Sequence, residues 1–330
     1  SGQADVVSLP NGAVVNDRYD DNGRLTGILH LKGSAIVSGV SYTLADNGQR
    51  INALEYDSQS VLVSGSPTNP AITRNYQYDG VGRLQQEQVI DRGNAAIRTT
   101  GYLYDRVGNR SQKIETTAGG TTITNYAYDA NDRLMQESRT VGGGSPAITA
   151  YTWDDNGNLS SKAIGTLVTV YGWDAQNRLV QVSQGASQAT ATVIAQFVYD
   201  SNGNRVQKIE PGASGQPDKV TAYLVDETFP YAQTVQETET LGSQTTSTRY
   251  VWGNSLIEQV RGGQGAFYHP DGLGSVKAIP APLKTHTAIP ANSSMMSATC
   301  NTTGHGGMTQ VWDGLLRWTR SQDSRHDLFH

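Results

Sequence analysis

The chain has 330 residues, a formal net charge of −5 and only 17% charged residues, below the share of about 25% that is usual in soluble domains. The acidic balance argues against a nucleic-acid partner, and no apolar run is long enough to cross a bilayer. A single cysteine, Cys300, excludes an internal disulfide framework, while 36 glycines beside many aromatic and β-branched residues favour a turn-rich all-β protein.

The leading part of the chain, residues 1–75, holds degenerate copies of a motif that becomes regular later. Leu9 to Gly12 predicts a turn. Tyr42 to Ile51 (YTLADNGQRI) has an aromatic, an Asp-Asn-Gly turn and an Arg, but no second aromatic. A further copy begins at Tyr56 and is followed by Ser58 to Asn69, which predicts a loop because it is rich in serine and proline.

Residues 76–226 repeat the motif regularly: an aromatic, a spacer, a second aromatic, an Asp, two residues, Gly or a substitute, then Asn or Arg. The copies read YQYDGVGRL, YLYDRVGNR, YAYDANDRL, YTWDDNGNL, YGWDAQNRL and FVYDSNGNR, and RYDDNGRL at residues 18–25 lacks only the first aromatic. Successive Asp residues are mostly 24 to 26 residues apart, with one step of 20. Such a period indicates a repeat architecture.

The chemistry of each copy predicts the tip of a β-hairpin. Tyr126 and Tyr128 are two residues apart, so on a strand they point to the same face, where successive aromatics are expected to stack as a ladder. Asp129 can open a turn, and Asn-Gly pairs in other copies tolerate positive φ. Looser Gly-containing turns lie between the tips, so the tips line one edge of a spiralling strip of antiparallel hairpins. The signature residues assigned a structural role are Tyr78, Asp79, Tyr104, Asp105, Tyr128, Asp129, Trp153, Asp154, Trp173, Asp174, Tyr199 and Asp200.

The pattern changes after Asp226 but stays β-like. Thr248 to Val260 (TRYVWGNSLIEQV) reads as aromatic, turn, aliphatic, and Phe267 to Ile279 (FYHPDGLGSVKAI) is a distinct block. His269 and Asp271 are two residues apart and could face the same way on a strand as a catalytic pair. A turn opened by Asp271 is the better interpretation.

The repeated YDxxGR/N units and the block FYHPDGLGSVKAI closely resemble bacterial Rhs proteins, also called YD-repeat proteins, whose repeats recur in the C component of insecticidal toxin complexes and in teneurins. The resemblance covers about residues 5–279. It implies a hollow β-hairpin shell that encloses a C-terminal toxin and is secreted or displayed on the bacterial surface. The self-cleaving end of the repeat-associated core has no match here, so no protease role is carried onto Asp271, and the shell is expected to be incomplete.

The remaining segment, residues 280–330, matches nothing in that family and is predicted to be a disordered tail that protease removes first. Its His286, Cys300, His305, His326 and His330 fit no zinc spacing, so no metal or cofactor is predicted. The chain therefore divides into degenerate repeats (1–75), regular repeats (76–226), the start of a core (227–279) and a tail (280–330).

Two functions remain open from the sequence. The first is a non-catalytic shell segment whose partners are a toxin polypeptide or other shell segments. The second is an extracellular adhesion module that binds cell-surface carbohydrate through Trp153, Trp173 and Trp252. The tryptophans occupy a position held elsewhere by Tyr, which favours packing over sugar stacking, and an enzyme is a distant third.

Overall fold

The computed structural model describes residues 6–9, 12–253, 255–272 and 274–278, and these form strands, turns and one short 3₁₀ helix. The strands up to the first regular repeat are β1 (Val6–Ser8), β2 (Ala13–Tyr19), β3 (Leu25–Lys32), β4 (Ala35–Leu44), β5 (Arg50–Tyr56), β6 (Val61–Val63) and β7 (Ser66–Thr68). The regular repeats contribute β8 (Ile72–Tyr78), β9 (Leu84–Asp91), β10 (Ala96–Tyr104), β11 (Arg110–Thr117), β12 (Gly120–Tyr128), β13 (Leu134–Val141), β14 (Ala147–Trp153), β15 (Leu159–Ile164), β16 (Leu167–Trp173), β17 (Leu179–Gly185), η1 (Gln188–Thr190), β18 (Thr192–Tyr199), β19 (Arg205–Glu210) and β20 (Lys219–Asp226). The last strands are β21 (Gln233–Leu241), β22 (Gln244–Trp252), β23 (Leu256–Arg261), β24 (Gln264–Phe267), β25 (His269–Pro270) and β26 (Val276–Ala278).

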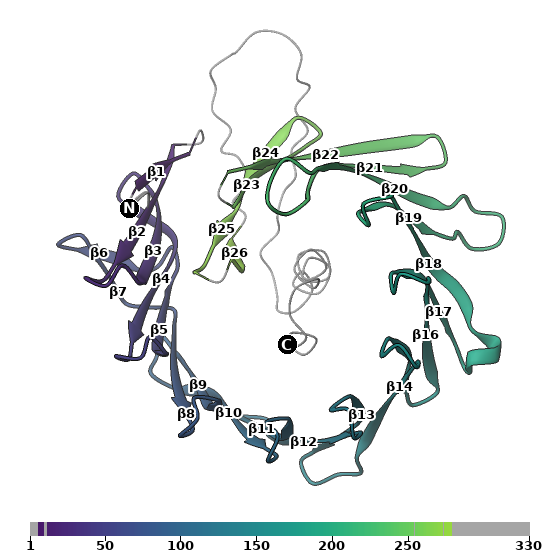
Figure 1. The fold of residues 1–330 in the computed structure, drawn as a ribbon. Helices are drawn as coiled ribbons and strands as arrows, with labels where there is room; N and C mark the ends of the chain where they lie inside the picture. The colour runs from purple at the N-terminus through teal and green to yellow at the C-terminus, as the bar shows by residue number, and fades with distance from the viewer. Residues whose placement is uncertain (1–5, 10–11, 254, 273, 279–330) are drawn as a thin grey trace.

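One antiparallel sheet of 22 strands dominates the protein, and its strands follow one another in sequence order except that β5 pairs with β8. The sheet curls into a nearly complete ring, in which β24 comes back close to β1 (Figure 1). Within the described residues no backbone pairing joins β24 to β1, so the ring is not closed as a sheet. The all-β fold class and the incomplete strip of hairpins predicted from the sequence are confirmed.

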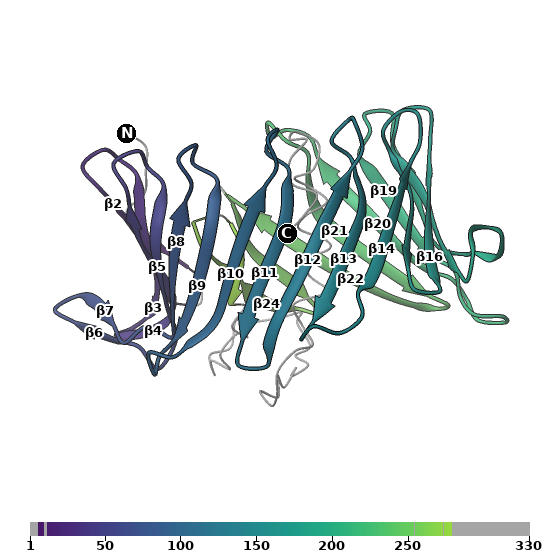
Figure 2. The same cartoon turned by 90° about the horizontal axis from the view of Figure 1, so that it is seen from below.

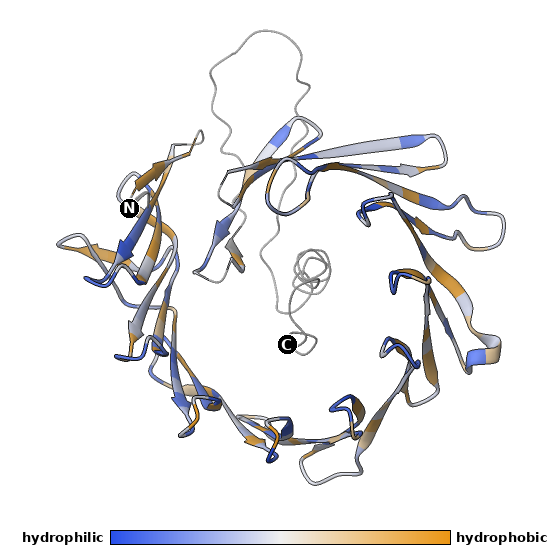
Figure 3. Ribbon diagram, in the orientation of Figure 1, coloured by the Kyte–Doolittle hydropathy of each residue, from blue (hydrophilic) through white to orange (hydrophobic). Residues whose placement is uncertain are grey.

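The strands run between two rims, visible in side view (Figure 2). The motif tips join β8 to β9, β10 to β11, and so on around one rim, where they form short hooks that bend towards the ring interior (Figure 1). These hooks are hydrophilic, whereas the strands between the rims carry apolar stretches (Figure 3). The looser turns, which vary in length, form the opposite rim.

The segment Ser58 to Asn69 corrects a prediction, because it is not simply a loop. It contains the two-stranded ribbon β6–β7, with Val61 opposite Thr68. Leu62 of this ribbon packs against buried Leu29, Ile36 and Tyr56, on the outside of the ring (Figure 1). The ribbon is stabilised by this tertiary contact of Leu62, while Val61 and Val63 on either side of it are exposed, and the serine and proline content obscured the short apolar run in the sequence.

The first hairpins are also covered on their inner side, the face that carries Tyr42. Ile28, Val40, Tyr42 and Ala53 form a buried cluster there, and the β25–β26 hairpin lies against it inside the ring (Figure 1). The sheet ends meet through side chains, since Leu9 and Ala13 cluster with Phe267 of β24.

The predicted tail, residues 280–330, lies outside the described residues, as do its histidines and Cys300. The four-part division of the chain remains a prediction. Nowhere in the described ranges does a helix have the length and hydropathy needed to cross a bilayer.

Candidate functional site

Each motif tip is a type I turn followed by a residue with positive φ, which places a β-bulge at the start of the outgoing strand. At Asp79, the backbone N–H of Gly82 donates to the Asp79 carbonyl at 3.0 Å, and Gly82 has φ +88°. Where glycine is replaced, Asp132 and Asn177 adopt positive φ themselves, at 60° and 58°. Only this third residue after the Asp adopts positive φ, and in the Asn22-Gly23 pair it is Gly23, at φ +73°, that supplies it, as expected of an Asn-Gly pair.

The signature Asp holds its turn with both carboxylate oxygens. Asp79 Oδ1 accepts the N–H groups of Val81 at 3.0 Å and Arg83 at 2.9 Å, while Oδ2 accepts the Arg83 Nε–H at 2.7 Å. Asp20, Asp129 and Asp174 make the same ion pair with Arg24, Arg133 and Arg178. Asp105, Asp154 and Asp200 precede Asn instead of Arg, and keep the same backbone bonds.

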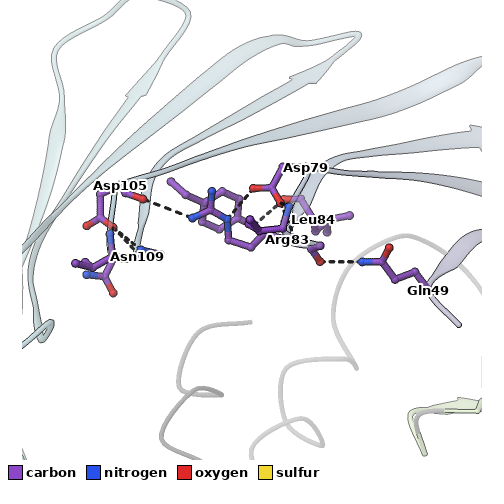
Figure 4. Close-up of polar contacts among 11 residues, drawn as sticks. Gln49, Asp79, Arg83, Leu84, Asp105 and Asn109 are labelled. Carbon is purple, nitrogen blue, oxygen red and sulfur yellow. Dashed lines mark hydrogen bonds and ion pairs between the residues drawn. The ribbon is translucent and has the colours of Figure 1, made fainter. Parts of the chain in front are cut away.

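The Arg of each tip also reaches the next hairpin. Arg83 Nη1 donates to the Asp105 carbonyl at 3.5 Å, and its guanidinium carbon lies 4.5 Å from the Tyr104 ring centroid (Figure 4). Where Asn replaces Arg, Asn109 Nδ2 donates to Asp132 Oδ1 of the following tip at 2.7 Å. The tips are therefore fastened to one another in series along the rim.

The second aromatic of the motif supplies the other fastening. Its polar tip donates a hydrogen bond to a backbone carbonyl at the start of the preceding outgoing strand. The bonds are Tyr78 to Arg50 (2.7 Å), Tyr104 to Leu84 (2.6 Å), Tyr128 to Arg110 (3.0 Å), Trp153 to Leu134 (2.9 Å), Trp173 to Leu159 (2.8 Å), Tyr199 to Leu179 (2.8 Å) and Trp252 to Thr234 (2.9 Å).

Sequence reasoning missed this role, although a signal was present. The second aromatic is Tyr or Trp in all seven of these copies, whereas the first aromatic includes Phe197. Tyr and Trp share what Phe lacks, a polar hydrogen donor at the end of the ring. The indole N–H groups of Trp153 and Trp173 are both bonded to backbone carbonyls of the preceding hairpin, so these half-buried tryptophans act as fastenings of the rim.

Removing one such donor should destabilise the protein measurably. We expect Tyr104→Phe to lower the free energy of unfolding by about 1 kcal/mol, since the part-buried Leu84 carbonyl loses the hydrogen bond from the phenol while the ring stays. Urea titration at pH 7 measures the change. Tyr231→Phe is the matched control, because Tyr231 is 74% exposed, and should change stability by less than about 0.5 kcal/mol. Equal effects of the two substitutions would contradict the fastening role.

The rim carboxylates should make the protein sensitive to acid. The Arg24 backbone N–H, and then the Arg24 side chain, hold the pKa of Asp20 below its ordinary value of 3.8. Because the folded-state pKa is the lower one, this stabilisation is present above the unfolded pKa and is lost as the pH falls through about 4 and below. The pKa values of Asp79, Asp129 and Asp174 are lowered in the same way.

Asp20→Asn tests this dependence, since Asn keeps the acceptor for the turn but loses the charge. We expect the variant's unfolding free energy to vary less between pH 2 and pH 5 than that of the unmodified protein. Asp21→Asn, at the exposed neighbouring position in the same turn, is the control and should follow the unmodified profile. If the unfolding free energies of all three proteins depended on pH in the same way, Asp20 would not be a source of the sensitivity to acid.

The first aromatic of the motif lies on the inner face. The pairing register carries this face from Tyr42 around the ring through Tyr76, Tyr102, Tyr126, Tyr151, Tyr171, Phe197, Tyr223 and Tyr250. Burial raises the pKa of Tyr76 and of Tyr223 to about 12. Cations lie between successive rings: the Arg110 guanidinium is 5.4 Å from the Tyr102 centroid and 5.1 Å from that of Tyr126. The expected aromatic ladder thus contains cation–π contacts.

The residues opposite these aromatics are mostly charged. Glu87, Lys113, Glu137, Lys162, Lys208 and Glu237 pair across strands with members of the row, and Lys162 Nζ lies 5.7 Å from the Tyr151 centroid. The inner wall is consequently an amphipathic band of aromatic rings and charges of both signs.

The seam, where the β25–β26 hairpin meets β3 and β4, is the other distinctive place. The turn Asp271 to Ser275 repeats the signature geometry, with Gly274 at φ +78° and Asp271 Oδ1 accepting the Ser275 N–H at 3.0 Å. The Gly272 N–H donates to the Tyr42 hydroxyl at 2.9 Å, and the His30 ring lies 4.3 Å from that of His269.

The twelve predicted signature residues all lie at the rim, on successive hairpins, and the structure brings them together only as neighbouring tips. Within the described residues no three His, Cys, Asp or Glu side chains are grouped as metal ligands. The geometry is that of a repeated structural joint.

Comparisons with known proteins point the same way. The family model described as the teneurin YD-shell matches residues 40–211, just over half of the 330-residue chain. Over 185 residues the chain is 25% identical to a protein named probable deoxyribonuclease RhsB from Dickeya dadantii, covering 48% of this chain and 12% of that one. Over 185 residues it is 26% identical to the tRNA3(Ser)-specific nuclease WapA of Bacillus spizizenii, covering 54% of this chain and 7% of that one.

Among solved structures, the Photorhabdus luminescens Tc holotoxin pore matches at 14% identity and a TM-score of 0.40, covering 84% of this chain and 16% of that chain. The crystal structure of TcdB2-TccC3-TEV matches at 15% identity and a TM-score of 0.41, covering 85% of this chain and 17% of that one. The chain thus spans less than a fifth of the length of each of these proteins.

Proposed function

The chain belongs to the teneurin YD-shell family, and on this premise we propose that it is a non-catalytic segment of shell wall that encloses or presents a toxin polypeptide. Two of its curated relatives carry nuclease names, which describe proteins many times longer than the matched region. We assign the wall no catalytic role, since each signature Asp is engaged in its own turn. We further propose that the protein acts outside the cell or on the bacterial surface.

The observation that carries the proposal is that the two aromatics of the motif have different structural roles. The second aromatic and the Arg fasten each hairpin to the next at the rim, for example through Tyr104 and Arg83. The first aromatic stays on the inner face with its charged cross-strand partner. Such a band offers apolar contact together with charges of both signs, which suits a polypeptide and not a single small ligand.

Enclosure predicts protection from protease. A reporter peptide without structure of its own, carrying one protease site, is joined after His330. We expect that site to be cut roughly tenfold more slowly than the same site in the free reporter, because the wall restricts access and close approach is needed for cleavage. The cleavage rate is followed by gel or mass spectrometry. A variant with a disrupted seam, Gly272→Val, is the matched control and should lose most of the protection.

Cleavage as fast as in the free reporter would contradict enclosure. Binding to a glycan array without any protection of the reporter would favour the adhesion alternative instead.

A further inference from the structure

Two buried histidines face each other at the seam. His30 on β3 is 2% exposed and His269 on β25 is 0% exposed, and their ring centroids are 4.3 Å apart. His30 Nε2 lies 3.3 Å from the Pro270 carbonyl, which assigns the proton of the neutral ring to Nε2. Across the same seam, the Gly272 N–H donates to the Tyr42 hydroxyl at 2.9 Å.

Within the described part of the chain, the pair lacks the hydrogen-bond acceptors that protonation of the rings would require. Among the described residues, His30 Nδ1 and both ring nitrogens of His269 lack a hydrogen-bond partner. A protonated imidazole has two N–H donors, so protonating His269 here would bury a charge without an acceptor, next to a second imidazole.

Ionisable groups around the pair do not compensate. On β4 and β5, the Tyr42 hydroxyl is engaged with Gly272 and the Arg50 guanidinium stacks on the Tyr42 ring at 3.7 Å. Arg50 is a cation and supplies no negative charge that would offset protonation of the pair.

The nearby acidic and phenolic groups either make hydrogen bonds to other residues or lie opposite a residue other than the histidines. Asp271 Oδ1 accepts the Ser275 N–H within its own turn, and the Tyr268 hydroxyl donates to Gln259. Asp17 of β2 shares the inner face but lies opposite Ile28, not opposite His30.

We propose that the His30–His269 pair is a proton-sensitive latch, which holds the β25–β26 hairpin on β3 and β4 at neutral pH and releases it on acidification. Release would break the hairpin's contacts with Tyr42 and His30, which bridge some 230 to 240 residues, and would leave the cluster of Leu9, Ala13 and Phe267 to hold the ends of the sheet together. The latch is independent of what the wall encloses, since it concerns only the contact between the ends.

The direction of the pH effect follows from linkage. Burial, and then the neighbouring His30, lower the pKa of His269 from 6.5 to about 4, and burial lowers that of His30. A released histidine binds protons below about 6.5, while the docked one resists them until about 4, so docking weakens as the pH falls through that range. For His269 alone, the equilibrium constant for release should rise roughly 25-fold between pH 7.5 and pH 5.0.

Hydrogen exchange measures that equilibrium directly, because the Gly272 N–H is bonded across the seam and exchanges only after release. Exchange of the peptide spanning β25 is followed by mass spectrometry at pH 7.5 and pH 5.0, each corrected for the intrinsic rate of a free peptide. We expect the corrected exchange of this peptide to rise roughly 25-fold at pH 5.0, while peptides from β12 and β13 change less than about twofold. The rim carboxylates, with lowered pKa values, stay ionised at both pH values.

Two variants separate the latch from general weakening of the seam. His269→Phe keeps an aromatic ring but cannot be protonated, and should lose most of the rise in corrected exchange between the two pH values, keeping only the part that is due to His30. Tyr42→Phe removes the acceptor for Gly272 and should raise exchange at both, leaving the ratio between them near 25-fold. His30→Phe replaces His269→Phe if the latter fails to fold, and should reduce the ratio.

Three results would overturn the proposal: equal exchange of the β25 peptide at both pH values, the full ratio retained in His269→Phe, or the same rise in β12 and β13 as at the seam. The last contrast needs only the unmodified protein, so it decides even if neither variant folds.

Discussion

Leu134→Ala is expected to lower the free energy of unfolding by roughly 3 kcal/mol, as for other large-to-small changes at fully buried sites. Leu134 is 2% exposed, it opposes Tyr128 across the bulge of its tip, and its carbonyl accepts the Trp153 indole N–H. The substitution leaves that carbonyl in place and removes only the apolar side chain, so the effect reports packing between adjacent hairpins. Urea titration with a common slope for variant and unmodified protein gives the difference.

Leu103→Ala is the matched control for this prediction. Leu103 sits between Tyr102 and Tyr104, on the opposite face from both, and is 50% exposed. The same chemical change should cost less than about 0.5 kcal/mol there. If both variants lose similar stability, burial at the tip does not hold the hairpins together.

Gly272→Val is expected to displace the β25–β26 hairpin from the inner face. A Cβ at residue 272 would lie 2.8 Å from Leu25 Cδ2 and 2.9 Å from Tyr42 Cε2. The Tyr42 ring cannot move aside easily, since Arg50 stacks on it and it is part of a buried cluster. Overpacking of this kind costs about 1 to 3 kcal/mol, so docking of the hairpin should weaken at least fivefold. Hydrogen exchange of residues 262–278 measures the release.

Gly80→Val provides the control at the equivalent turn position. Gly80 follows Asp79 as Gly272 follows Asp271, but a Cβ at residue 80 would meet nothing within 4 Å. The variant should fold and exchange like the unmodified protein. An unchanged exchange pattern in Gly272→Val would show that the close approach at the seam is not required for docking.

The hairpin strip was predictable because its determinants are local. The spacing of Tyr126 and Tyr128 sets the face, Asp129 opens the turn, and a residue that accepts positive φ follows three positions later. Because the unit recurs, a position that is misread in one copy can be recognised by comparison with the other copies. The ribbon within Ser58 to Asn69 was missed for the opposite reason: it is a single, unrepeated insertion whose strands depend on packing against Tyr56.

The rim fastenings and the seam were not predicted, because both are tertiary. The acceptor for Tyr104 is the backbone of Leu84, and a backbone carbonyl has no sequence signature. The seam joins His30 to a hairpin 240 residues further along the chain. No sequence pattern near either histidine indicates that the two lie side by side. The restriction of the second aromatic to Tyr or Trp was the one feature of the sequence that indicated the rim hydrogen bonds.

The order of the strands has a consequence for how the chain acquires its structure. Since nearly every strand in the large sheet pairs only with its sequence neighbours, each hairpin can form as soon as it emerges and then serve as the template for the next. The growing edge moves from β2 towards β24 in the direction of synthesis. The contacts of Phe267 with Leu9 and Ala13, and those of the β25–β26 hairpin with β3 and β4, require partners far back in the sequence. Such low sequence separation favours rapid, directional folding, whether the chain leaves a ribosome or passes through a narrow export channel. The seam is then the final event, and a chain stopped before residue 268 would carry ordered hairpins but none of the contacts that the β25–β26 hairpin makes with His30 and Tyr42.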